Sequence, residues 1–240
     1  MKILLILLPF FLLIAFTSGK AQSLSQILKR HEEAVGRKAL NKAETVIIKS
    51  EITSGKIKIN VESTYKRPYK VRSESSLGNE KFINACDGKT AWESDPSKNL
   101  GRPHLLNKVE TERIKSQSVF EGSLYRYKEK GSTIALLGKE KLNGKPVFKL
   151  KLVKKNGETE IIYIDAATYL FARTITEPVK GSNKNERIAD ISEYRSVKGI
   201  KFPFRFEVHS GENKIMQIVN SVEVDKKVPD SYFEFKNPAK

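Results

Sequence analysis

The stretch from Gly138 to Thr176 constrains the fold of this chain more than any other part of the sequence. Apolar and basic side chains alternate there: Phe148, Leu150 and Leu152 are separated by Lys149 and Lys151. Successive side chains of a β-strand point to opposite faces, so this alternation predicts a strand with one apolar face. Asn143-Gly144 and Asn156-Gly157 flank the strand, and both pairs tolerate the positive φ angles of tight hairpin turns. The stretch therefore predicts a meander of antiparallel strands.

The same alternation returns along most of the chain after Thr45. Apolar residues at every second position form three further sets: Ile57, Ile59 and Val61; Phe202, Phe204 and Phe206; and Met216 and Ile218. We count about ten or eleven such antiparallel strands, and a single sheet of that size must curl or split. Either the curled sheet closes around a packed interior, or it leaves apolar volume for a hydrophobic ligand. The spacing alone does not decide between the two.

Two segments depart from the alternation. Ser23 and Gln26 form a capping box at the start of an amphipathic helix whose apolar stripe runs from Leu24 to Val35, and Gly36 ends it. The second segment, Asp95 to Lys130, contains loop-forming Pro and Gly residues and a short stretch that fits a helix. A long insertion in a compact fold is often functional, so we expect this one to cover the apolar face.

Residues 1–21 have the pattern of a secretory signal peptide. A basic start precedes an apolar run from Ile3 to Phe16, which is too short for a comfortable membrane span. Gly19-Lys20-Ala21 fits signal peptidase, so we expect a mature start at Gln22 and a single domain over residues 22–240. An uncleaved anchor is the alternative. Cys86 is the only cysteine, which excludes an internal disulfide and fits a periplasmic protein with a buried thiol.

The chain is strongly basic, with 44 Lys and Arg against 28 Asp and Glu and a formal net charge of +16. The basic residues are spread along the polar sides of the strands, which indicates a solvated outer surface. Transient contact with an anionic membrane surface is a reasonable secondary effect. Nucleic-acid binding is disfavoured, because the chain has an export signal and no recognisable nucleic-acid module.

Nothing in the sequence points to an enzyme, a metal or a cofactor. There is no Gly-x-Ser-x-Gly elbow, no phosphate-binding loop and no pair of histidines at metal-ligand spacing. The three histidines, His31, His104 and His209, lie far apart in the sequence. We therefore expect no catalytic activity and no bound cofactor.

Three motifs resemble a known family. Tyr65-Lys66-Arg67-Pro68-Tyr69 is followed by Asp87-Gly88-Lys89-Thr90-Ala91-Trp92, and the chain closes on Phe233-Glu234-Phe235-Lys236-Asn237-Pro238. Together these motifs resemble those of the periplasmic outer-membrane lipoprotein carriers, the LolA-like family. The opening helix, the number of strands and the insertion after the Trp92 hairpin agree with this resemblance.

The resemblance implies an unclosed antiparallel β-barrel, mostly β with a few helices, covered by a short helical lid. Its cavity would hold the acyl chains of lipoproteins, or another lipid, for delivery toward the outer membrane. Arg67 would be the lid latch, which binds backbone carbonyls of the lid when no cargo is present. Combined with the alternation, this predicts a ligand-binding apolar cavity with the following lining: Ile57, Ile59, Val61, Trp92, Phe148, Leu150, Leu152, Phe202, Phe204, Phe206, Met216 and Ile218.

The expected partners are lipid acyl chains, with an inner-membrane transporter as donor and an outer-membrane acceptor, and the protein is expected to be a monomer. Two alternatives stay open at the level of sequence. One is a lipid-sensing regulator of the envelope, and the other is a β module that binds sugar or protein. A concave face that proved fully packed would favour the binding module.

Overall fold

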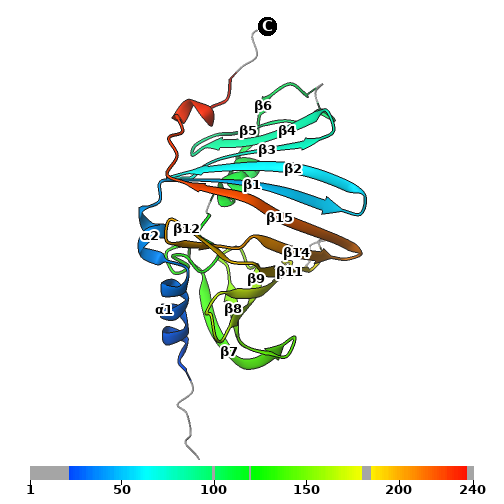
Figure 1. Ribbon diagram of the computed structural model, residues 1–240. Helices are drawn as coiled ribbons and strands as arrows, with labels where there is room; N and C mark the ends of the chain where they lie inside the picture. The colour runs from blue at the N-terminus through cyan, green and yellow to red at the C-terminus, as the bar shows by residue number, and fades with distance from the viewer. Residues whose placement is uncertain (1–21, 99–100, 119, 180–184, 237–240) are drawn as a thin grey trace, which may run out of the picture.

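The computed structural model describes residues 22–98, 101–118, 120–179 and 185–236 of the 240-residue chain (Figure 1). The predicted signal peptide therefore lies outside the described residues, as does Pro238 of the C-terminal motif. Among the described residues, no helix is long and apolar enough to cross a membrane.

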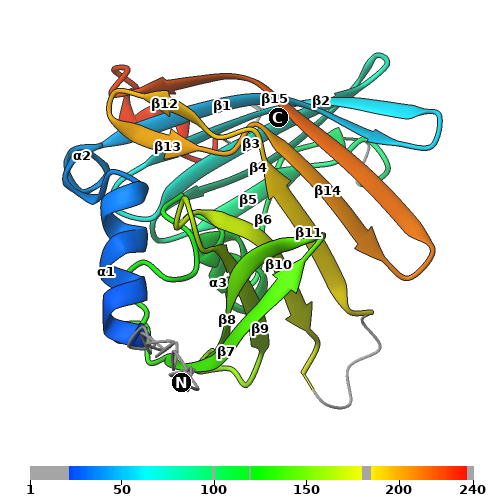
Figure 2. The ribbon, with the colours of Figure 1, turned by 60° about the horizontal axis from the view of Figure 1, so that its bottom comes forward.

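Antiparallel strands make up most of the described chain. They are β1 Thr45–Ser54, β2 Ile57–Lys66, β3 Lys70–Leu77, β4 Glu80–Asp87, β5 Ala91–Ser94, β6 His104–Leu105, β7 Thr133–Leu142, β8 Lys145–Val153, β9 Thr159–Asp165, β10 Phe171–Glu177, β11 Arg187–Ser192, β12 Arg195–Val197, β13 Ile200–Phe202, β14 Arg205–Ser210 and β15 Asn213–Val224. Within the described residues, thirteen strands form one sheet in the order β6-β5-β4-β3-β2-β1-β15-β14-β11-β10-β9-β8-β7, and β12 pairs only with β13. The edge strands β6 and β7 do not pair with each other, so the curled sheet is an unclosed barrel (Figure 2).

The helices begin where the sequence offers capping groups. In α1, Leu24–Ala34, both halves of the Ser23–Gln26 capping box are formed, as predicted. Gly36, at a φ of +79°, ends this run and leads directly into a second short helix, α2 Arg37–Lys42. The insertion contributes α3, Lys108–Ser116, which starts with a second capping box between Asn107 and Glu110. A single 3₁₀ turn, Asp230–Tyr232, follows β15.

The mostly β architecture with an opening helix is confirmed, but the strands are shorter and more numerous than predicted. The alternation of Phe202, Phe204 and Phe206 predicted one strand, but the chain is divided at Pro203-Phe204 into β13 and β14. Proline cannot donate to a sheet ladder, which explains the break. Between β11 and β12 the extended backbone is interrupted at Glu193, which lies at a φ of +56°.

The three helices cover separate parts of one face of the sheet, here called the concave face. Ile27 of α1 packs with Phe148, Leu150 and Ile162 of β8 and β9. Leu40 of α2 packs beside β1, β13 and β15, and Ile114 of α3 packs on β3, β4 and β5. Figure 2 shows α3 within the curve of the sheet and α1 along its side.

The opposite face of the sheet, the outer face, is covered at one end by the C-terminal segment (red in Figure 1). Phe233 is completely buried, and its carbonyl accepts a hydrogen bond of 3.0 Å from the indole of Trp92. Arg72 donates to the Tyr232 carbonyl at 3.1 Å. Asp230 bonds both Lys66 and Lys70 at 2.7 Å, and these bonds lower the pKa of its carboxyl to about 2. The segment is therefore fixed to β2, β3 and β5.

Candidate functional site: the concave face and the insertion

The concave face is continuous across the middle of the sheet. Residues directly opposite each other on paired strands share a face. By this rule Leu150, Ile162, Thr174, Ala189, Val208 and Ile215 form one row from β8 to β15. A second row runs from Phe206 through Gln217 and Ile52 to Ile59. The two rows join on β14 and β15, so one surface, apolar except at Thr174 and Gln217, extends along them from β8 to β2.

Five of the predicted lining residues lie on or beside this surface in fully packed positions. Phe148, Leu150 and Leu152 are buried against Ile27 of α1 and Leu124 of the insertion. Phe202 and Phe204 are buried with Leu40 of α2 and Tyr125 of the insertion. Protein side chains already cover these five residues.

Other predicted lining residues lie on the concave face with part of their surface exposed. Ile59, Val61 and Phe206 are half-buried. Ile57, at the tip of the β1–β2 hairpin, is 52% exposed. The same region contains three half-buried apolar residues that the sequence analysis did not single out: Ile52, Phe82 and Ile215. The apolar surface near the hairpin tips is thus accessible.

Trp92, Met216 and Ile218 were predicted in the cavity, and the structure places all three on the outer face. Trp92 is opposite Ala85 and contacts the C-terminal segment. In β15 the register shifts opposite Lys49 and Ser50, so that Asn220 is an extra residue. A β-bulge of this kind reverses the alternation. Val222 and Val224 therefore face inward, whereas Met216 and Ile218 face outward.

Arg67 lies at the corner after β2 and joins three parts of the structure. Its guanidinium donates to the Leu40 carbonyl of α2 at 3.0 Å and to the Tyr125 hydroxyl at 3.4 Å. It also forms an ion pair of 2.6 Å with Glu121, whose side chain is only 6% exposed. The resemblance implied bonds to backbone carbonyls of the lid. In this structure the carbonyl belongs to α2, and the insertion contributes a carboxylate and a hydroxyl.

The insertion spans the concave face from one side to the other. Ile114 packs with Val71 and Cys86 at the β3–β4 side. At the β8–β9 side, Ser123 donates to the Glu160 carboxylate at 3.2 Å. Burial raises the pKa of Glu160, and Lys154 opposes that shift. Arg67 binds the C-terminal part of this insertion, through Glu121 and Tyr125.

Solved structures share the fold of this chain. One is a domain from Vibrio parahaemolyticus that is assigned as an outer membrane lipoprotein-sorting protein. It superposes with a TM-score of 0.57 at 16% identity, over 86% of this chain and 97% of its own. A LolA superfamily protein from Nitrosomonas europaea superposes with a TM-score of 0.58 at 12% identity, over 90% of this chain and 99% of its own. A DUF1329 family protein from Desulfovibrio piger superposes with a TM-score of 0.58 at 12% identity, over 87% of this chain and 97% of its own.

The chain has the LolA fold. At these identities the likeness concerns the fold, and it extends over nearly the whole length of each neighbour. No protein-family model matches the sequence, and no curated protein matches it either.

In this LolA fold, a buried histidine joins α1 to the start of β10. His31 is 7% exposed, stacks on Phe171 with ring centroids 4.7 Å apart, and bonds the Tyr169 carbonyl through Nδ1 at 2.8 Å. Burial lowers the pKa of His31, and nearby Arg37 acts in the same direction. The neutral ring donates from Nδ1 and serves as a packing residue that connects α1 to β10.

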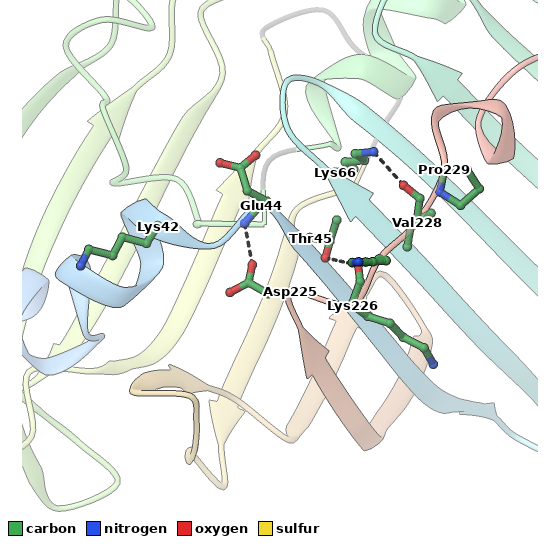
Figure 3. A pocket seen from close by; sticks show the side chains of 9 residues that line it. Lys42, Glu44, Thr45, Lys66, Asp225, Lys226, Val228 and Pro229 are labelled. Carbon is green, nitrogen blue, oxygen red and sulfur yellow. Dashed lines mark hydrogen bonds between the residues drawn. The ribbon is translucent and has the colours of Figure 1, made fainter.

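A surface pocket of about 590 Å³ lies outside the concave face, where α2 meets β1 and the end of β15 (Figure 3). Its polar groups are largely bonded to one another: the Glu44 amide donates to Asp225 at 2.8 Å, Thr45 to the Lys226 carbonyl at 2.7 Å, and Lys66 to the Val228 carbonyl at 2.7 Å. These bonds fasten the chain after β15 to β1 and β2. Among the described residues, no three His, Cys, Asp or Glu side chains gather closely enough to hold a metal ion.

Proposed function

We propose that this protein is a periplasmic carrier that shields the acyl chains of lipoproteins, or of another lipid, on its concave face and delivers them toward the outer membrane. The observation that carries the proposal is the accessible part of that face, formed by Ile52, Ile59, Val61, Phe82 and Phe206. Burying hydrocarbon there is favourable, at about 0.8 kcal/mol for each methylene removed from water.

The dimensions of this surface suit a long hydrocarbon chain. Ile59 and Tyr65 lie on the same face of β2, six residues apart. At about 3.3 Å per residue this separation is roughly 20 Å. One leaflet of a bilayer has a hydrocarbon depth of about 15 Å, half of the usual core of about 30 Å. The length of this path therefore matches a single extended acyl chain, which would occupy it after the insertion, whose Phe120 packs on Tyr65, has moved away.

The insertion and Arg67 supply the means to cover and release cargo. The insertion lies across the concave face and is held by few long-range polar contacts, of which the Arg67–Glu121 pair is the most buried. Opening this contact would uncover the apolar clusters around Tyr125 and Leu124. In the proposal, cargo occupies the uncovered surface, and the protein performs no catalytic step.

The export route and the partners are part of the same proposal. Residues 1–21 would direct secretion and leave Gln22 as the mature N-terminus. An inner-membrane transporter would load the carrier, and an outer-membrane acceptor would receive the cargo. The basic surface would favour transient contact with anionic lipid.

The proposal is tested by purifying the full chain from the envelope of a cell that exports it and identifying co-purified lipid by mass spectrometry. We expect one acylated molecule per protein, and displacement of the neutral dye Nile red by a diacylated lipopeptide. Peptide mass spectrometry of the same sample should find Gln22, as glutamine or as pyroglutamate, at the N-terminus. A preparation without lipid, together with no displaceable dye binding, would refute the carrier function.

A further inference from the structure

Four cations surround the buried ring of Tyr125. The distances to the ring centroid are 4.9 Å for Arg37, 5.4 Å for Arg126, 5.8 Å for Arg67 and 5.8 Å for Lys130. They come from α2, the corner after β2 and the insertion. One energetically significant cation–π pair is usual in about 70–80 residues, so four around one ring is an unusual concentration of positive charge. We call these four residues the cationic cluster.

Three carboxylates pair with three of the four cations, which leaves the cluster one positive charge in excess, at the exposed position Lys130. Glu32 pairs with Arg37 at 3.0 Å and Glu129 with Arg126 at 3.5 Å, but these carboxylates are 45% and 68% exposed. Glu121, on Arg67, is the one that is deeply buried. Within the part of the chain that the structure describes, no carboxylate lies within 4 Å of the Lys130 ammonium. Burial lowers the pKa of Lys130, opposed by the Glu121 charge.

Two donors of the cluster have no acceptor among the described residues. They are the Nε atoms of Arg37 and Arg67, and both are buried. A buried donor left without a partner costs about 1–3 kcal/mol, so native structures seldom keep one without a use. A guanidinium fork with its Nε and Nη donors matches the paired oxygens of a phosphate or carboxylate.

The cluster adjoins the concave face. Tyr125 packs with Leu40, Val46, Phe204 and Val219 in the apolar cluster beneath α2. An amphiphile with its hydrocarbon on the concave face can therefore place its polar end against Tyr125 and its cations. Glu121 holds the position on Arg67 that such an anion would take.

We propose that the cationic cluster binds the anionic group, a phosphate or carboxylate, of an amphiphile whose hydrocarbon lies on the concave face. In the structure, the Glu121 carboxylate holds Arg67, and the arriving anion displaces it. The insertion, which is joined to Arg67 through Glu121, is thereby released from the corner after β2. This inference rests on the proposed function, because it assumes a hydrocarbon cargo and adds the charge of its head group.

The test compares two lipids with the same acyl chains, didecanoyl phosphatidic acid and didecanoylglycerol, as displacers of Nile red from the full chain. We expect the wild type to prefer the phosphatidic acid by roughly tenfold, the effect of one charge-assisted hydrogen bond. Arg37→Gln and Lys130→Gln should lose this preference and keep their affinity for didecanoylglycerol. Lys151→Gln removes one exposed charge from the outer face and should behave as the wild type. Glu121→Gln should increase the preference.

The outcomes separate the two proposals. Equal affinity of the wild type for both lipids, or a preference that persists in Arg37→Gln and Lys130→Gln, overturns the anion site and leaves lipid carriage standing. Binding of neither lipid refutes lipid carriage. The third measurement adds inorganic phosphate in place of the lipids. If phosphate alone raises the melting temperature of the wild type but not of Arg37→Gln, the site takes a free anion. That result contradicts the proposal that the ligand is an amphiphile.

Discussion

Arg67 and Glu121 form an ion pair of 2.6 Å that joins the corner after β2 to the insertion, across 54 positions of sequence. Both side chains are largely removed from water, with 23% and 6% of their surface exposed. A pair of this kind is sensitive to the loss of either partner, because the remaining charge is left buried without compensation.

We predict that Arg67→Leu and Glu121→Leu each lower the free energy of unfolding. The loss should approach the roughly 3–5 kcal/mol that is typical of breaking a buried pair. The double variant should lose much less than the sum of the two. Urea denaturation of the four proteins measures this coupling. The outer-face pair Arg205–Glu207, at 3.0 Å with 34% of each side chain exposed, is the control and should show coupling of about 0–1 kcal/mol. Additive losses at Arg67 and Glu121 would contradict the structural role of the pair.

We also predict that Arg67→Leu separates binding from delivery. Without the Arg67 contacts the covered, empty state is weakened, so the variant should bind a diacylated lipopeptide at least as tightly as the wild type. It should transfer that lipopeptide to acceptor vesicles more slowly, because covering the concave face no longer helps to expel cargo. Dye displacement and transfer of labelled lipopeptide are measured side by side. Unchanged values of both in a folded variant would reduce Arg67 to a corner residue.

The position of Trp92 gives a spectroscopic prediction. It is the only tryptophan, and it lies on the outer face against the Phe233 carbonyl. Its fluorescence should therefore not change when a lipopeptide binds on the concave face. Phe233→Ala should shift the emission to the red and lower the free energy of unfolding by about 3–5 kcal/mol, since Phe233 is completely buried. A large change of Trp92 emission on lipid addition would place the ligand on the outer face and contradict binding on the concave face.

His31 makes stability depend on pH. Burial lowers its pKa in the folded protein below the usual 6.5, so the unfolded chain binds the proton more readily. The contribution of a neutral His31 is complete above pH 6.5 and is lost progressively as the pH falls below it. The free energy of unfolding of His31→Gln should thus decline less between pH 7.5 and pH 5.5, values on either side of the usual pKa. His209→Gln, at an exposed position, is the control and should decline like the wild type.

Local patterns predicted much of this fold. The alternation through Phe148, Leu150 and Leu152 correctly predicts β8 and its inward face, because every second residue of a regular strand shares an environment. The Ser23–Gln26 capping box likewise predicts the start of α1, since its bonds form within four residues. Such features depend only on neighbours in the sequence.

Features that depend on distant partners were not predictable. The bulge at Asn220 is defined by the register of β15 against β1, and it places Met216 and Ile218 on the outer face although their spacing is regular. The register of β5 places Trp92 on the outer face, where Phe233 from the far end of the chain covers it. The pairing of Arg67 with Glu121, and the gathering of cations at Tyr125, likewise need the insertion folded onto the corner after β2. Nothing in the local sequence signals these contacts.

The most direct test of the account places a reporter on each face of the sheet. Ile59→Cys lies on the concave face and Met216→Cys on the outer face, and both positions are half-buried. The native Cys86 is completely buried, so the unsubstituted protein should not react with a polarity-sensitive thiol dye and serves as the labelling control. We predict that a diacylated lipopeptide shifts the emission of the dye at position 59 to the blue and leaves the dye at position 216 unchanged. No shift at position 59, or equal shifts at both positions, would contradict lipid binding on the concave face.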